Sequence, residues 1–250
     1  MLKIEHLTKI YEGGVQALTD VSFEVDDGQF LAIIGLSGSG KSTLLRCINR
    51  LIEPTEGRIT WNGVDITAAP QEELRRIRRR IGMVFQQFNL VHRSRVITNV
   101  LAGRLGYVNP ALSLFNRFPQ ADMERALQQL DRVGLAEKAM SRADELSGGQ
   151  QQRVGIARAM VQQPEMILAD EPVASLDPVL AHGIMQYLED INRSDDVTTL
   201  CSLHFLDLVH PYADRAIALN DGFLVFDGSP AEIDDARFKE IYGKEAERIG

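Results

Sequence analysis

The chain has 250 residues, of which 44% are hydrophobic, so it is long enough for one large domain and global disorder is excluded. Its 27 basic and 35 acidic side chains give a net charge of −8, which argues against a general nucleic-acid-binding protein. The two cysteines, Cys47 and Cys201, lie far apart and indicate small buried side chains in a reducing compartment, not a disulfide framework.

The N-terminal residues 1–14 alternate between apolar and polar side chains and contain no continuous apolar stretch of the signal-peptide kind. The longest apolar runs fall far short of the roughly 18 residues that a membrane-spanning helix needs. We therefore expect a cytoplasmic protein that can still dock on a membrane protein.

The first third of the chain predicts strands around one glycine-rich loop. Alternating or continuously apolar runs indicate strands, and amphipathic runs with a wider period indicate helices. The run 29–35 is apolar throughout, as expected of a strand covered on both faces. The predicted elements are strands over 2–8, 21–25 and 29–35, a helix over 42–51, a strand over 57–63, a helix over 70–80 and a strand over 81–87.

The middle of the chain is helical, and strands return after it. An irregular stretch over 107–120, rich in Pro, Asn and aromatic residues, interrupts the helical region. A hairpin is predicted over 215–228, with Asn220, Asp221 and Gly222 at its turn. The other predicted elements are helices over 97–106, 121–134, 178–193 and 229–243, strands over 165–171 and 198–204, and a helix after Gly149.

This order predicts an α/β protein with one domain over 1–250. Residues 1–88 and 162–250 are expected to form a nucleotide-binding core. Residues 89–161 are expected to form a helical subdomain inserted into that core.

The glycine-rich loop carries the first chemical motif. Residues 35–42 fit G-x-x-x-x-G-K-[ST], and they follow a predicted strand and precede a predicted helix, which is the context a P-loop requires. Backbone N–H groups of such a loop cradle phosphates, and Gly38 and Gly40 allow a close approach of the backbone. Lys41 would reach the β- and γ-phosphates, and Ser42 would coordinate Mg²⁺.

Two acidic residues end the apolar strand that is predicted over 165–171. Asp170 can hold Mg²⁺ through water at the edge of the sheet, and Glu171 can polarise an attacking water as a general base. A strand that ends in solvated acids is common, but beside a P-loop this pair indicates hydrolysis of a nucleotide.

A second helix start, at "LSGGQ" over 146–150, offers free N–H groups that suit a phosphate. Together with "LADEP" over 168–172 and "SLD" over 175–177, this motif makes the chain resemble the nucleotide-binding subunits of ABC transporters along essentially its whole length. The resemblance implies a P-loop NTPase core with an N-terminal antiparallel β subdomain and an inserted α-helical subdomain that carries the signature motif. It also implies ATP and Mg²⁺ as cofactors, and ATP hydrolysis.

The resemblance assigns a role to each motif residue. Tyr11 matches the aromatic that stacks on adenine, and Gln86 matches a glutamine that links the core to the helical insert and contributes to the metal site. His204 matches a histidine that contacts the γ-phosphate and joins Lys41 and Glu171 in catalysis. The further matches to nucleotide-binding positions are Gly35, Ser37, Gly38, Ser39, Gly40, Ser42, Thr43, Ser147, Gly148, Gly149, Gln150 and Asp177.

In this family two subunits pack head to tail, so that each signature motif caps the γ-phosphate held by the other subunit. The resemblance therefore implies a homodimer with two composite sites. It also implies integral membrane permease subunits as partners and, indirectly, a periplasmic or extracellular solute-binding protein. The expected location is the cytoplasmic face of the bacterial cell membrane, with no nucleic acid as partner.

Within the family, the stretches "FQQFNLV", "RVGLAEKA" and "LSGGQQQRVGIARAM" resemble the ATP-binding subunits of bacterial phosphonate importers. The region over 91–100 and the region after His204 depart from that pattern. Amino-acid and phosphite importers share many of the same sequence motifs. The excursion near residues 114–117 is expected to lie near the membrane subunit, because an aromatic loop of this length exceeds what packing requires.

Alternatives remain for several of these residues. Tyr11 could be a surface aromatic, Gln87 could take the place of Gln86, and His204 could be a hydrogen-bonded core histidine. The basic run 75–80 is expected to be a solvated helix face. A soluble ABC protein of DNA repair or translation would carry a coiled-coil insertion or tandem domains, and a non-hydrolysing regulatory module would lack the catalytic set.

Overall fold

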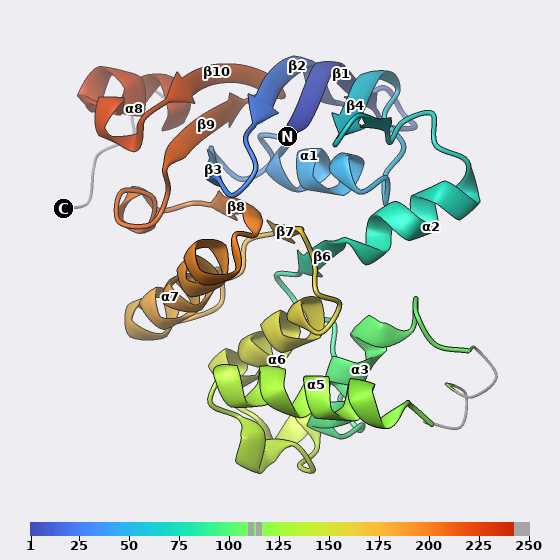
Figure 1. The fold of residues 1–250 in the computed structure, drawn as a ribbon. Helices are drawn as coiled ribbons and strands as arrows, with labels where there is room; N and C mark the ends of the chain where they lie inside the picture. The colour runs from blue at the N-terminus through green and yellow to red at the C-terminus, as the bar shows by residue number, and fades with distance from the viewer. Residues whose placement is uncertain (110–112, 114–116, 243–250) are drawn as a thin grey trace.

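The fold of the protein was analysed in a computed structural model, which describes residues 1–109, 113 and 117–242 (Figure 1). The expected excursion near residues 114–117 lies largely outside the described residues. The strands are β1 (Leu2–Ile10), β2 (Gln16–Val25), β3 (Phe30–Ile34), β4 (Glu56–Trp61), β5 (Val64–Asp65), β6 (Ile81–Val84), β7 (Met166–Ala169), β8 (Thr198–Leu203), β9 (Arg215–Asn220) and β10 (Phe223–Gly228). The α-helices are α1 (Lys41–Ile48), α2 (Gln71–Arg79), α3 (Val96–Leu101), α5 (Gln120–Arg132), α6 (Gly148–Met160), α7 (Pro178–Asp195) and α8 (Asp235–Tyr242).

The strands form two sheets. A four-stranded antiparallel sheet has the order β2-β1-β4-β5, and a six-stranded sheet has the order β10-β9-β3-β8-β7-β6. In the second sheet the strands from β9 to β6 are parallel, and β10 pairs antiparallel with β9. The expected fold class, an α/β core with an N-terminal antiparallel β subdomain, is confirmed.

Helix α1 lies between the two sheets, as Figure 1 shows. Its apolar side chains share one core with inward-facing residues of β1 and β2 and with Leu31 and Ile33 of β3. The alternate β3 residues, Phe30, Ala32 and Ile34, join a second core on the opposite face of the six-stranded sheet. Because β3 is buried on both faces, it forms a fixed base for the loop that follows it.

Helices α3, α5 and α6 pack against one another beside the six-stranded sheet (Figure 1). A buried ion pair, Arg104 Nε to Asp122 Oδ1 at 2.9 Å, joins the end of α3 to the start of α5. This arrangement agrees with the expected helical signature subdomain, while its limits at residues 89 and 161 stay a prediction. Among the described residues, no helix is both long enough and apolar enough to cross a membrane.

The hairpin turn between β9 and β10 follows the expected chemistry. Asp221 and Gly222 both have positive φ angles, of 47° and 82°, as the two central residues of a type I′ turn require. The two-residue strand β5 was not predicted, because a pairing this short leaves no periodic pattern in the sequence.

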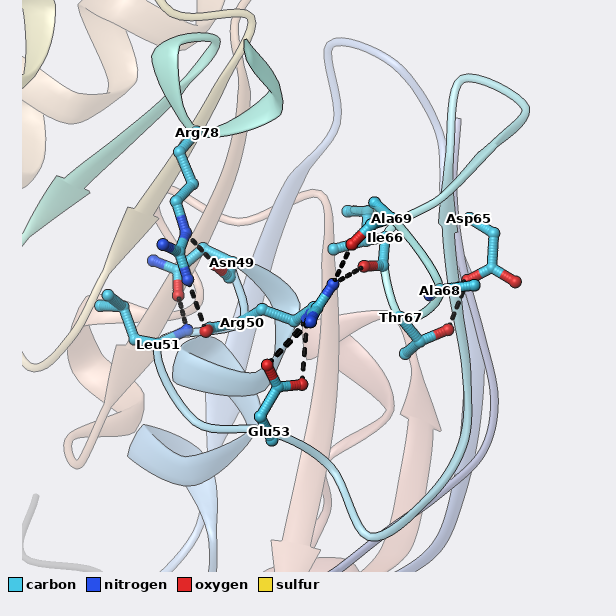
Figure 2. A network of polar contacts seen from close by, with 10 residues as sticks. All are labelled: Asn49, Arg50, Leu51, Glu53, Asp65, Ile66, Thr67, Ala68, Ala69 and Arg78. Atoms are coloured by element: carbon cyan, nitrogen blue, oxygen red, sulfur yellow. Dashed lines mark hydrogen bonds and ion pairs between the residues drawn. The ribbon is translucent and has the colours of Figure 1, made fainter. Parts of the chain in front are cut away.

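The basic run 75–80 is not simply a solvated helix face, and this corrects the expectation. Arg78 turns inward and donates to the carbonyl oxygens of Asn49 and Arg50 (Figure 2). The Arg80 guanidinium lies 4.7 Å from the centre of the Trp61 ring. Arg50 in turn donates to the Ile66 and Ala69 carbonyls (Figure 2). Backbone carbonyls left free where α1 ends attract the Arg78 guanidinium, which joins α1 to α2.

Candidate functional site

The glycine-rich loop connects β3 to α1 and adopts a backbone that only glycine accepts easily. Gly35, Gly38 and Gly40 have φ angles of 141°, 83° and 107°. An added Cβ would lie 2.2 Å from the Leu219 carbonyl oxygen at Gly35, and 2.4 Å from the Ala17 carbonyl oxygen at Gly40. At Gly38 it would meet no atom within 4 Å, so the loop faces open space there.

Lys41 begins α1 and folds back over the loop. Its Nζ donates to the carbonyl oxygens of Gly35 and Leu36, both at 2.8 Å, and the residue is only 3% exposed. Burial lowers the pKa of Lys41, while the charges of Glu171 and Asp170 oppose that shift. The ammonium group is therefore held at the loop, close to both acidic residues.

The two serines within the loop differ in their surroundings. Ser37 is exposed, whereas Ser39 is buried and its Oγ has no hydrogen-bond partner among the described residues. An unpaired buried hydroxyl is costly unless a further group completes it. Ser39 Oγ thus offers a free donor inside the loop.

Ser42 and Asp170 meet at the end of the six-stranded sheet. Ser42 Oγ donates to Asp170 Oδ1 at 2.7 Å, and Arg46 lies 3.0 Å from the other carboxylate oxygen. Asp170 is 1% exposed, so Arg46 balances a charge that is almost fully removed from water.

Glu171 and His204 form the second pair at this edge. His204 Nε2 lies 2.6 Å from Glu171 Oε1, and the Glu171 N–H donates to Ser202 Oγ at 2.8 Å. Glu171 has a φ of 48°, a left-handed conformation that is rare for a side chain of this kind. Since β7 and β8 are parallel neighbours, their carboxyl ends bring the two residues together.

Tyr11 lies at the other side of the loop. Its hydroxyl is 3.2 Å from Thr43 Oγ1, and the Lys9 ammonium sits 5.2 Å from the centre of its ring. The structure therefore places Tyr11 beside the first turn of α1, on the side of the four-stranded sheet.

The signature residues form the start of α6. Ser147 Oγ accepts from the Gln150 N–H at 3.4 Å, and Gln150 Oε1 accepts from the Ser147 N–H at 3.0 Å, which is a capping box. Gly148 is exposed, and Gly149 packs against Leu180. Within the described residues, no hydrogen bond joins this helix start to the glycine-rich loop of the same chain.

Asp177 and Gln86 also remain apart from the phosphate loop. Asp177 caps α7, since its Oδ1 accepts from the Val179 and Leu180 N–H groups at 3.1 Å. Gln86 is exposed and makes no hydrogen bond to Ser42 or Asp170 in the part of the chain described. The structure thus gathers Tyr11, the loop, Asp170, Glu171 and His204, and leaves Gln86, Asp177 and the signature outside that cluster.

Comparison with known proteins identifies the family. A family model described as ABC transporter matches residues 18–174, which is more than half of the chain. The chain belongs to the ABC transporter family.

Proteins with curated names match over almost the whole chain. The chain is 49% identical to Phosphonates import ATP-binding protein PhnC 3 of Halalkalibacterium halodurans, over 98% of this chain and 95% of that protein. It is 50% identical to Phosphonates import ATP-binding protein PhnC of Bdellovibrio bacteriovorus, over 100% of this chain and 96% of that protein.

Solved ABC cassettes share the fold. A dimeric ATP-binding cassette in a post-hydrolysis state, bound to ADP and Pi, is 35% identical and superposes with a TM-score of 0.82, over 92% of this chain and 99% of that chain. A second ABC transporter cassette, in its ADP conformation, is 32% identical with a TM-score of 0.83, over 96% of each chain. The fold of an ABC ATPase is thus confirmed.

Two residues of this ABC cassette site were not predicted from the sequence. Arg46 follows Ser42 by four positions on α1, so helical spacing alone could have placed it beside the same carboxylate. Ser202 holds the Glu171 N–H, and the only signal for it is a serine within a buried apolar strand.

Proposed function

We propose that this chain is the ATP-hydrolysing subunit of a bacterial ABC importer for phosphonates. The observation that carries the proposal is an identity of about half of all residues, along the full length, with proteins named as phosphonates import ATP-binding proteins. The arrangement of the phosphate loop, Asp170, Glu171 and His204 supports the hydrolytic part of the proposal.

The phosphate loop would bind the triphosphate of ATP. The open space at Gly38 and the unpaired Ser39 hydroxyl leave room and a donor for phosphate oxygens. The Lys41 ammonium would exchange its contacts with the Gly35 and Leu36 carbonyls for the more strongly charged phosphate oxygens. The other residues of the loop around the phosphates would be Gly35, Ser37, Gly40 and Thr43.

Ser42 and Asp170 would hold Mg²⁺, with Gln86 as a further oxygen donor. A hydroxyl and a carboxylate already 2.7 Å apart present the hard oxygen ligands that this ion prefers. Bound there, the ion would neutralise charge on the β- and γ-phosphates. Arg46 pairs with the buried Asp170 carboxylate and holds its orientation.

Glu171 would act as the general base that removes a proton from the attacking water. The contact with His204 and the N–H donation to Ser202 restrict the carboxylate to one position. A left-handed backbone at a residue of this type is a strained feature of the kind found at active sites. His204 would also contact the γ-phosphate, as its place at the end of β8 permits.

Tyr11 would act within its own chain, whereas the other residues would act across a homodimer. Tyr11 would stack on adenine, while Ser147, Gly148, Gly149, Gln150 and Asp177 would face the γ-phosphate held by the second copy. The support is that the α6 start is partly exposed and, among the described residues, makes no hydrogen bond to its own phosphate loop. A dimeric ABC cassette among the structural relatives supports the same assembly.

Integral membrane permease subunits would transmit the closure of this dimer, at the cytoplasmic face of the membrane. A solute-binding protein would act through the permease, and nucleic acid is not a partner. An importer of amino acids or of another small solute is the alternative, because this subunit would not touch the solute.

The test is reconstitution of the chain with its permease and solute-binding protein in liposomes. We expect a phosphonate to stimulate ATP hydrolysis several-fold, whereas glutamine or histidine leaves the rate unchanged. Stimulation by an amino acid and not by a phosphonate would replace the proposed solute with the alternative one.

A further inference from the structure

The segment that carries Gln86 has an unusual backbone. It follows β6, and two successive residues in it, Phe88 and Asn89, have positive φ angles of 56° and 49°. Asparagine tolerates this conformation, but phenylalanine seldom adopts it, because its Cβ crowds the neighbouring carbonyl. A backbone of this kind persists only where its surroundings hold it.

Arg158, on α6, is the side chain that holds it. The guanidinium donates to both strained residues, with one amine 2.6 Å from the Asn89 carbonyl oxygen and the other 2.8 Å from the Phe88 carbonyl oxygen. It also lies 6.0 Å from the centre of the Phe85 ring. A guanidinium can serve two adjacent carbonyls at once because its donors are fixed in one plane.

Arg158 is partly buried, and its hydrogen bonds go to the main chain of the loop. Burial lowers the pKa of Arg158, and among the described residues no carboxylate charge offsets that shift. Backbone carbonyls, and not an anion, therefore satisfy the partly buried guanidinium. Its position therefore serves the loop and not an ion pair.

The face of α6 that meets the loop lies next to Phe88. Added Cβ atoms at Gly148 and Gly155 would each lie 3.9 Å from an atom of Phe88, which is an ordinary van der Waals distance, so Phe88 packs beside this face of the helix. Gln152 lies on the same face by helical spacing, and it is fully buried. Neither polar atom of its carboxamide has a hydrogen-bond partner among the described residues.

We infer that Arg158 is a positioning residue, which fixes the segment of Gln86 to the helix that begins at Ser147; this inference rests on the proposed function. Arg158 lies eleven residues along α6 from Ser147, roughly 16 Å at the helical rise. A displacement of α6 as the signature engages phosphate is thereby passed to the main chain at Phe88 and Asn89. Gln86, two residues earlier, then moves towards Ser42 and Asp170.

The experiment compares Arg158→Met and Arg158→Lys with a matched control on the same helix. Arg153→Met removes an arginine that donates to the Val133 carbonyl oxygen and, in the part of the chain described, makes no hydrogen bond to the loop. Hydrogen exchange at the amides of Phe88 and Asn89 is measured in each protein. We expect at least tenfold faster exchange for Arg158→Met, an intermediate rate for Arg158→Lys, and no change for Arg153→Met.

The second measurement combines each change with Glu171→Gln and counts ATP-bound closed dimers. We expect Arg158→Met to reduce the closed dimer at least tenfold, while a fluorescent ATP analogue binds the monomer within threefold of the unchanged affinity. Equal behaviour of the Arg158 and Arg153 variants in both measurements would overturn the inference. Absence of a closed dimer with Glu171→Gln alone would instead contradict the proposed function.

Discussion

His204 Nε2 lies 2.6 Å from Glu171 Oε1, which joins the ends of two neighbouring parallel strands through their side chains. The Glu171 main chain is fixed separately by its N–H donation to Ser202. A carboxylate held at both its backbone and its tip has little freedom to turn away from the phosphate loop. This arrangement would hold Glu171, the proposed general base, in one orientation although its backbone is strained.

Glu171→Gln should bind MgATP and hydrolyse it at least ~10²-fold more slowly, because an amide keeps the shape but cannot accept a proton. Steady-state phosphate release and nucleotide trapping measure the two effects. Glu165→Gln, which changes a half-exposed carboxylate paired with Arg80, is the control and should keep the rate. Hydrolysis by Glu171→Gln at the unchanged rate would remove Glu171 from the role of base.

Lys41→Ala should lose nucleotide binding while the fold persists. The ammonium is the buried cation that donates to the loop carbonyls, and without it the phosphate charge is not neutralised. Titration with a fluorescent ATP analogue, together with a thermal melt, separates loss of binding from loss of structure. Near-normal affinity in a folded variant would show that the phosphate loop assignment is incomplete.

Tyr11→Ala should weaken ATP binding by about 1–2 kcal/mol, the size expected from loss of base stacking. Tyr11→Phe keeps the ring and removes only the hydroxyl contact with Thr43, so it should bind nearly as well as the unchanged chain. Discrimination between ATP and GTP should stay poor in all three, because stacking does not read a base edge. If Tyr11→Ala binds normally, Tyr11 is a surface aromatic.

The signature should act across the dimer, which two tethered dimers can decide. One carries Lys41→Ala in the first copy and Ser147→Arg in the second, and the other carries both changes in the same copy. In a trans arrangement the first dimer retains one intact composite site and the second retains none. We expect the first to trap one ATP and the second to trap none.

Because both tethered dimers contain the same substitutions, the loss of the Ser147 cap on α6 affects them equally. The comparison therefore isolates the geometry from the stability of the helix. The reverse result, with trapping only where both changes share one copy, would establish a cis arrangement.

The native thiols should resist alkylation. Cys47 and Cys201 are fully buried, and burial raises the pKa of Cys47 from 9.0 to about 12 and that of Cys201 further. Alkylation at pH 8 then requires opening of the core, and ATP at a concentration of 100 Kd should slow it ~100-fold. Rapid labelling of the native chain, followed by mass spectrometry, would contradict this burial.

The same shifts set a pH dependence of stability. In the unfolded chain both thiols ionise near pH 9.0, whereas in the folded chain they stay protonated. The free energy of unfolding should therefore fall as the pH rises above 9.0. Denaturant titrations at pH 8 and pH 10 measure the change. Replacing both cysteines by alanine should reduce this slope.

Local patterns predicted much of this fold because most elements agree with their surroundings. The apolar run of β3 and the turn at Asp221 and Gly222 each have a direct physical reason in the sequence. Contacts between distant segments were not predicted. Arg78 joining α2 to the end of α1, and Arg158 joining α6 to Phe88, depend on where free backbone carbonyls lie after folding, and no linear spacing encodes that.

The phosphate loop is wedged between two pieces of main chain, the Ala17 carbonyl of β2 and the Leu219 carbonyl of β9. Both sheets therefore fix the conformation of the loop. Nucleotide binding then costs little conformational entropy of the main chain. Trimming a neighbouring side chain cannot by itself make room for a Cβ at Gly35 or Gly40, because the nearest obstacle at each is a peptide carbonyl oxygen. Genetic suppressors of Gly40→Ala should consequently map to residues that alter the path of β2.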